Sequence, residues 1–130
     1  NVFHTSSRIN STWGGSLVDM VRATKYLEII DEENLVKNAA EVGAYLRHQL
    51  RTLSANVGEH RITNIRGSGL FSAFDLPTKE DRNTFLKQAF DNGLLLVGSG
   101  SRSVRFRPPL NLSKQEVDLG MELIEKSMTK

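Results

Sequence analysis

The longest regular pattern in the sequence is an apolar repeat that begins at Leu35 and stops before Gly58. Its members follow one another at steps of four and three residues, which is the spacing of one face of an α-helix. These positions are Leu35, Ala39, Val42, Leu46, Leu50, Leu53 and Val57. The repeat lasts only about three heptads, so a helix that faces a protein core is favoured over a coiled coil. Any fold for this chain must therefore bury one side of a long helix.

Shorter segments around this helix indicate a mixed fold. An amphipathic pattern over 15–30 predicts a preceding helix, which the acidic sequence at 31–34 interrupts. The other predicted elements are two short strands joined or kinked at 67–69, a helix over 78–93, a buried strand at 94–97, a strand around 104–106 and a terminal helix after a capping box at 113–116. This order predicts an α+β fold with a small, mostly antiparallel sheet that helices cover on one side.

Composition narrows the classes of function. A length of 130 residues with 38% hydrophobic content predicts one domain with one core. The 17 basic residues exceed the 15 acidic ones only slightly and form no basic arm. This small surplus of positive charge gives only weak support to nucleic-acid binding. The absence of cysteine excludes disulfides, thiolate metal sites and a cysteine nucleophile. His4, His48 and His60 are too scattered to indicate a metal site, so we expect none.

The sequence contains no apolar run long enough to span a bilayer and no pattern of the signal-peptide kind. We therefore expect a soluble, cytoplasmic protein, and the absence of cysteine fits a reducing compartment. The chain also begins without a Met, and we interpret it as a piece of a longer protein.

Two glycine-rich stretches begin like a dinucleotide-binding motif. They are "GSGLFS" at 67–72 and "GSGSRS" at 98–103. Ser72 and Ser103 stand where that motif needs its third glycine, and neither stretch opens a helix after a strand. We interpret both as turns.

The stretch "NSTWGGS" at 10–16 places two hydroxyls and two glycines directly before a predicted helix. A helix N-terminus offers unpaired N–H groups and a positive dipole end, so the hydroxyl of Thr12 beside glycines could help to hold a phosphate. An N-cap followed by a glycine turn explains the same residues, and the local sequence by itself favours that simpler interpretation.

The strand sequence "SVRFRPP" carries Arg105 and Arg107 at alternate positions, which predicts that both lie on one face. Pro108 and Pro109 would stiffen the exit of the strand. A fixed guanidinium suits a carboxylate because it can bind both oxygens at once. Arginines on a strand also serve simply to protect a sheet edge, and for this motif by itself that is the favoured alternative.

Taken in order, these motifs resemble the C-terminal part of the class III pyridoxal-phosphate aminotransferases. "RINSTWGG" comes first, "NIRGSGLFSAF" follows the long helix and "VRFRPPLNLSKQEVD" comes last, so the resemblance covers essentially all 130 residues. It implies that 1–130 is the small C-terminal domain of a fold-type I enzyme. Asn10, Trp13 and Arg107 are most similar to the branch that uses L-lysine. The implied reaction is transfer of a terminal amino group, with the 6-amino group of L-lysine expected, to 2-oxoglutarate; ornithine and 4-aminobutyrate remain alternative donors.

The resemblance also implies site residues. Thr12, with Ser11 beside it, matches the hydroxyl that contacts the phosphate of the pyridoxal 5'-phosphate bound by the neighbouring subunit of a homodimer. Arg105 matches the arginine that binds the carboxylate of the substrate. Asn10 is a second candidate for the substrate end of the site.

The resemblance places the catalytic parts of the family outside this chain. The Schiff-base lysine, the acid at the pyridine nitrogen and the aromatic that stacks on the ring all precede the matched part, so we expect the chain alone to be inactive. Lys25 lies mid-helix and is no substitute. The alternative is a stand-alone α+β module that binds an acidic small ligand through Arg105 and Arg107. A nucleic-acid-binding domain would rest on the pI of about 9.1 alone.

Overall fold

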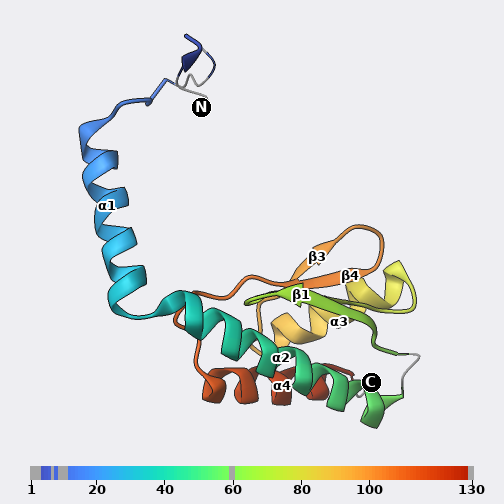
Figure 1. Ribbon diagram of the computed structural model, residues 1–130. Helices are drawn as coiled ribbons and strands as arrows, with labels where there is room; N and C mark the ends of the chain where they lie inside the picture. Colours follow the sequence, from blue (N-terminus) through green and yellow to red (C-terminus); the bar gives the residue numbers. More distant parts are fainter. Residues whose placement is uncertain (1–3, 7, 9–11, 59–60, 129–130) are drawn as a thin grey trace. The chain divides into compact units, whose positions relative to one another are not determined.

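The structure, a computed structural model, describes residues 4–6, 8, 12–58 and 61–128. The chain divides into two compact units, residues 1–34 and residues 35–130 (Figure 1). The first unit contains helix α1, Leu17–Glu32. None of the residues of this helix is buried. The predicted apolar pattern therefore forms a helix, but the helix contributes no fully buried side chain.

The second unit contains the remaining helices and all the strands found among the described residues. They are α2 (Leu35–Val57), β1 (Thr63–Ser68), β2 (Phe71–Asp75), α3 (Lys79–Asp91), β3 (Val97–Ser99), β4 (Ser103–Phe106) and α4 (Lys114–Met128). The capping residues predicted from the sequence start two of these helices. Thr78 and Asp81 form a capping box at α3, and Ser113 exchanges hydrogen bonds with Glu116 at the start of α4.

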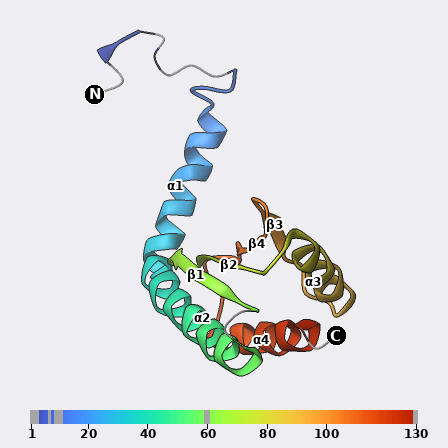
Figure 2. The same ribbon diagram turned by 90° about the vertical axis from the view of Figure 1, so that its right-hand side faces the viewer.

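The four strands form one sheet in the order β1-β2-β4-β3, and each neighbouring pair is antiparallel. Figures 1 and 2 show α2 and α4 side by side, with the sheet on one side of them. This arrangement confirms the predicted α+β fold with a small antiparallel sheet. Within residues 35–58 and 61–128, no helix covers the opposite face of the sheet, which we call the open face.

The core lies between the helices and the covered face of the sheet. Its buried hydrophobic residues are Val42, Leu46, Leu50, Leu53, Ile62, Leu70, Phe74, Leu76, Phe85, Ala89, Val104, Phe106, Val117, Ile124 and Met128. Phe74 stands at the centre, with its ring centroid 5.9 Å from those of both Phe85 and Phe106. The long repeat predicted from the sequence supplies four of these residues from α2, which confirms the core-facing helix.

The first glycine-rich stretch joins β1 to β2 as a turn, as predicted. Helix α2 lies so close to this turn that a Cβ on Gly43 would overlap the carbonyl oxygen of Gly69. The same oxygen accepts a hydrogen bond of 2.6 Å from Nη1 of Arg47 on α2. Gly69 itself has φ +53°, a left-handed conformation that glycine adopts at little cost. The two glycines therefore fix how the helix meets the sheet.

The prediction of a buried strand over 94–97 is wrong. Strand β3 begins only at Val97, and Leu95 is 76% exposed. The N–H of Leu94 is instead used to end α3, because it donates to the carbonyl of Ala89 at 2.8 Å. The register of β3 with β4 would also place Leu94 opposite Pro108, which has no N–H to give to a ladder.

Candidate functional site

Arg105 lies in the middle of the sheet on the open face. Its strand, β4, runs between β2 and β3, and Arg105 is paired with Ala73 on one side and Val97 on the other. Its neighbours Val104 and Phe106 are buried in the core. Because successive side chains of a strand point to opposite faces, the side chain of Arg105 belongs to the face that no helix of this unit covers.

The guanidinium of Arg105 contains a buried N–H donor, at Nε, that has no hydrogen-bond acceptor among the described residues. The side chain is half-buried, and its Nε atom is buried without a hydrogen-bond partner. Among the described residues it is the only buried side-chain nitrogen or oxygen atom in that state. A buried donor without an acceptor costs about 1–3 kcal/mol, more when it is charged. An external carboxylate would supply acceptors with the geometry that a guanidinium fits best.

Arg107 occupies a different setting from the one that the strand pattern predicted. Strand β4 ends at Phe106, so Arg107 lies beyond the paired residues, and its side chain is exposed. It precedes Pro108, which restricts it to an extended backbone conformation. Strand pairing therefore holds Arg105 in place but does not hold Arg107.

A cavity of about 270 Å³ lies between the segment at 94–97, the end of β4 and α4. Most of its lining is aliphatic, and both Arg105 and Arg107 contribute to it. Its acidic member, Glu116, is already engaged: its carboxylate accepts 2.8 Å hydrogen bonds from the backbone N–H and the hydroxyl of Ser113. These hydrogen bonds lower the pKa of Glu116, and the one from the backbone N–H of Ser113 has the larger effect. Glu116 therefore serves the helix cap.

Thr12 lies in a turn that precedes α1, and its side chain is exposed. The N-cap of α1 is Ser16, whose hydroxyl accepts a 3.4 Å hydrogen bond from the N–H of Asp19. The cap interpretation of the stretch at 10–16 therefore holds for Ser16 and not for Thr12. Gly15, with φ +80°, provides the turn between them. The predicted site residues Asn10 and Ser11 lie outside the described residues.

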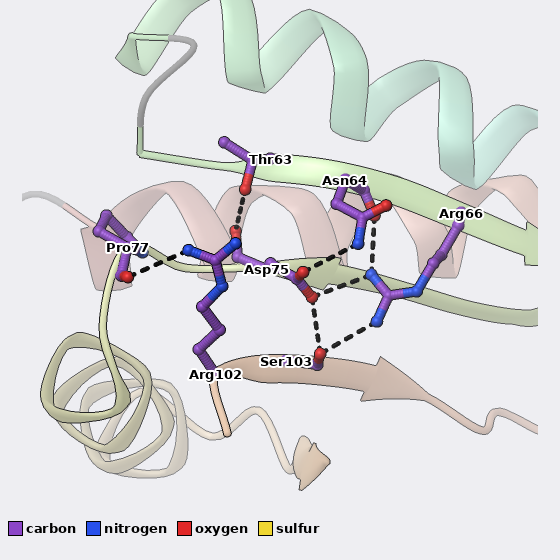
Figure 3. Close-up of polar contacts among 7 residues, drawn as sticks. All are labelled: Thr63, Asn64, Arg66, Asp75, Pro77, Arg102 and Ser103. Atoms are coloured by element: carbon purple, nitrogen blue, oxygen red, sulfur yellow. Dashed lines mark hydrogen bonds and ion pairs between the residues drawn. The ribbon is translucent and has the colours of Figure 1, made fainter. Parts of the chain in front are cut away.

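A polar cluster on the open face was not predicted from the sequence (Figure 3). We call it the Asp75 cluster; its members are Asn64, Arg66, Asp75 and Ser103. The Asp75 carboxylate accepts hydrogen bonds from Nη1 of Arg66 at 2.9 Å, from the Ser103 hydroxyl at 2.6 Å and from the Asn64 amide at 2.9 Å. The cluster thereby joins β1, β2 and β4. An acid at the end of the apolar strand sequence "FSAFD" was the one available signal.

The environment of Asp75 favours its ionised form. Burial by itself would raise the pKa of this carboxyl. The hydrogen bonds from Ser103, Asn64 and Arg66, together with the positive charge of Arg66, outweigh burial, so the pKa lies below its ordinary value. Asp75 is thus a buried carboxylate that the cluster keeps charged and satisfied.

Comparison with known proteins identifies the family to which the chain belongs. The family described as aminotransferase class-III matches residues 1–128. The chain belongs to the class-III aminotransferases. The L-lysine-epsilon aminotransferase of Mycobacterium tuberculosis is 41% identical over 128 residues, and that of Amycolatopsis lactamdurans is 43% identical over 129 residues. Each alignment covers 98% of this chain.

The fold of this class-III aminotransferase chain matches solved structures as well. The lysine aminotransferase from M. tuberculosis is similar with a TM-score of 0.86 and 43% identity over 95% of this chain. The aligned part makes up 28% of the solved chain and 28% of each of the two curated relatives. The chain therefore spans little more than a quarter of the length of the proteins it matches.

Proposed function

We propose that residues 1–130 form the small C-terminal domain of a longer pyridoxal-phosphate aminotransferase. This enzyme transfers a terminal amino group, that of the 6-position of L-lysine, to 2-oxoglutarate. The family match, the names of the two curated relatives described above and the share of their length that the chain covers support the proposal. No helix among the described residues is long and apolar enough to cross a membrane. As a separate point, we propose that the enzyme is cytoplasmic, because the absence of cysteine from the sequence fits a reducing compartment.

The observation that carries the proposal is the Nε atom of Arg105, which is buried without a hydrogen-bond acceptor among the described residues. Strand pairing on both sides fixes the backbone of Arg105. Both proposed substrates carry a carboxylate, which can accept two parallel N–H bonds from one guanidinium. Arg105 would therefore bind and orient amino donor and keto acid in turn, and Asn10 would assist at the substrate end.

The residues near α1 fit the phosphate of the cofactor. When bound, pyridoxal phosphate supplies the electron sink of the reaction. Thr12 offers an exposed hydroxyl that the helix cap does not use, and the turn glycines let a ligand approach the backbone closely. We propose that Thr12 and Ser11 donate hydrogen bonds to the phosphate across the interface of a homodimer. The exposed apolar side chains of α1 support contact with other parts of the full-length protein; they include Leu17, Val18, Val21 and Leu27.

We propose further that the chain by itself is inactive. The family uses a lysine in the preceding part of the protein to hold the cofactor. Lys25 does not replace it, because its side chain is 60% exposed and its Nζ pairs with Glu28 at 2.9 Å. Pyridoxal phosphate followed by borohydride should label the isolated chain weakly at several lysines. Mass spectrometry that found stoichiometric labelling at one lysine, with turnover, would contradict this.

The reaction itself is tested with the full-length enzyme. L-Lysine, L-ornithine and 4-aminobutyrate are each supplied with 2-oxoglutarate, and kcat/KM is compared. The proposal predicts the highest value for L-lysine, with glutamate as the product. A higher value for L-ornithine or 4-aminobutyrate would overturn the donor assignment. If the enzyme turned over none of the three donors, the proposed reaction would be overturned.

A further inference from the structure

The open face carries a potential competitor for Arg105. In the register of β2 with β4, Ala73 is opposite Arg105 and Asp75 is opposite Ser103. Alternation therefore places Arg105 and Asp75 on the same face as diagonal neighbours. Such neighbours are about 7–8 Å apart at the backbone, which is within reach of a long side chain. A carboxylate of the protein thus lies where it could pair with Arg105.

This pairing does not occur, because the other members of the cluster occupy the carboxylate. Oδ1 of Asp75 accepts from Nη1 of Arg66 and from the Ser103 hydroxyl, and Oδ2 accepts from the Asn64 amide. Nη2 of Arg66 also donates to the Ser103 hydroxyl at 3.0 Å, so the guanidinium spans the carboxylate and its neighbour on β4 (Figure 3). Among the described residues, the Nε atom of Arg105 remains buried without a hydrogen-bond partner.

A second hydrogen bond holds Arg66 in the position from which it pairs with the Asp75 carboxylate. Its Nη1 donates to the backbone carbonyl of Asn64 at 2.8 Å as well as to Asp75. Asn64 has φ +50° within the irregular stretch of β1 between Thr63 and Arg66. This left-handed residue interrupts the regular pairing of β1 with β2 at the place where the carbonyl and the amide of Asn64 meet the cluster. The irregularity of β1 therefore lies where Asn64 contacts both Arg66 and Asp75.

We infer that Arg66 is a positioning residue that sequesters Asp75 and so keeps Arg105 available for the carboxylate of the substrate. The inference rests on the proposed function of Arg105. Without Arg66, a buried negative charge would face Arg105 across one diagonal of the sheet. The two would then pair, and every substrate would have to displace Asp75 before it could bind. Arg66 would act on substrate binding without touching the substrate.

The test uses Arg66→Met in the full-length enzyme, with L-lysine and 2-oxoglutarate as substrates. Competition from Asp75 should raise KM for both substrates about three- to tenfold, while kcat changes little. Adding Asp75→Asn removes the competitor. KM of Arg66→Met/Asp75→Asn should therefore fall back to that of Asp75→Asn alone. If Arg66 only stabilised the sheet, the second substitution would instead leave KM as high or raise it further, which would overturn the inference.

Arg102→Met is the matched control, because Arg102 lies beside the cluster but, among the described residues, its side chain donates to the carbonyl of Pro77 at 3.3 Å and to no member of the cluster (Figure 3). It should leave KM unchanged, and an equal rise in this variant would contradict a specific role for Arg66. If Arg66→Met does not fold, Arg66→Gln removes the same charge and should raise KM in the same way. Arg105→Ala separates the two proposals: no rise in its KM refutes the proposed function, whereas a rise there without one in the Arg66 variants refutes only this inference.

Discussion

Helices α1 and α2 follow one another in the sequence, and both are predicted from apolar periodicity, yet they differ in what they bury. Helix α2 contributes Val42, Leu46, Leu50 and Leu53 to the core. Helix α1 has no buried residue, and its Leu27 is 67% exposed. A period of 3.6 residues predicts that a segment is helical and has an apolar side. It does not reveal whether the partner that covers this side lies within the same piece of chain.

The largest expected effect tests this difference with one substitution in two helices. Leu50→Ala should lower the free energy of unfolding of the 130-residue chain by about 2–5 kcal/mol, because Leu50 is fully buried. Leu27→Ala should change it by less than about 0.5 kcal/mol. Both changes place alanine inside a helix, so helix propensity is matched. Urea unfolding measures both, and similar losses would break the comparison.

A second experiment asks what the first unit does if it does not supply core. Thr12→Ala in the full-length enzyme would remove the hydrogen bond that we propose to the charged phosphate, and such a bond is worth about 1.5–3 kcal/mol. The dissociation constant of pyridoxal phosphate should rise roughly ten- to hundredfold.

Ser16→Ala is the matched control for Thr12, since it deletes another hydroxyl in the same stretch. It removes the N-cap of α1 and should cost about 0.5–2 kcal/mol of helix stability while leaving cofactor affinity as it was. Unchanged cofactor affinity in a folded Thr12→Ala enzyme would remove the functional role of Thr12.

The smallest effect concerns how the two units use acidic residues. The pKa of Asp75 in the folded state lies below the ordinary value of 3.8, so the ionised form stabilises the fold. This contribution is complete above that ordinary value and is lost as the pH falls through the lowered pKa. Between pH 6 and pH 3, Asp75→Asn should therefore lose less unfolding free energy than the unmodified chain does.

Asp19→Asn in α1 is the control for Asp75. Asp19 pairs with Arg22 at 2.9 Å, but both side chains are more than half exposed, and such pairs contribute little. Its pH profile should follow that of the unmodified chain in chemical unfolding at both pH values. A flatter profile for Asp19→Asn than for Asp75→Asn would reverse the assignment.

Much of the fold could be predicted because its signals are local. Thr78 with Asp81 and Ser113 with Glu116 begin helices by contacts within four residues, so the sequence contains the whole motif. Strand β3 was misplaced because its start depends on how α3 ends and on which residue of β4 lies opposite.

The candidate site was only partly predictable, because it depends on contacts between residues that lie far apart in the sequence. Alternation placed Arg105 and Arg107 on one face of a strand. That the Nε atom of Arg105 is buried without a hydrogen-bond partner depends on the neighbouring strands, which the sequence does not locate. The Asp75 cluster unites residues from β1, β2 and β4, and no spacing along the chain announces it. Strand alternation alone could not rank Arg105 and Arg107, and the choice of Arg105 came from the family resemblance. In the structure, strand pairing holds only Arg105.

The most direct test of the central claim compares Arg105→Lys with Arg107→Lys in the full-length enzyme. Lysine keeps the charge but lacks the planar fork that binds a carboxylate through two N–H groups. Steady-state kinetics should show KM for L-lysine and for 2-oxoglutarate rising about tenfold or more in Arg105→Lys, with a smaller change in kcat. The reason is that the proposed contact would be made in the bound substrate and in the transition state alike. Arg107→Lys should change KM less. A larger rise in Arg107→Lys, or unchanged KM values in Arg105→Lys, would contradict the role of Arg105 in binding the substrate carboxylate.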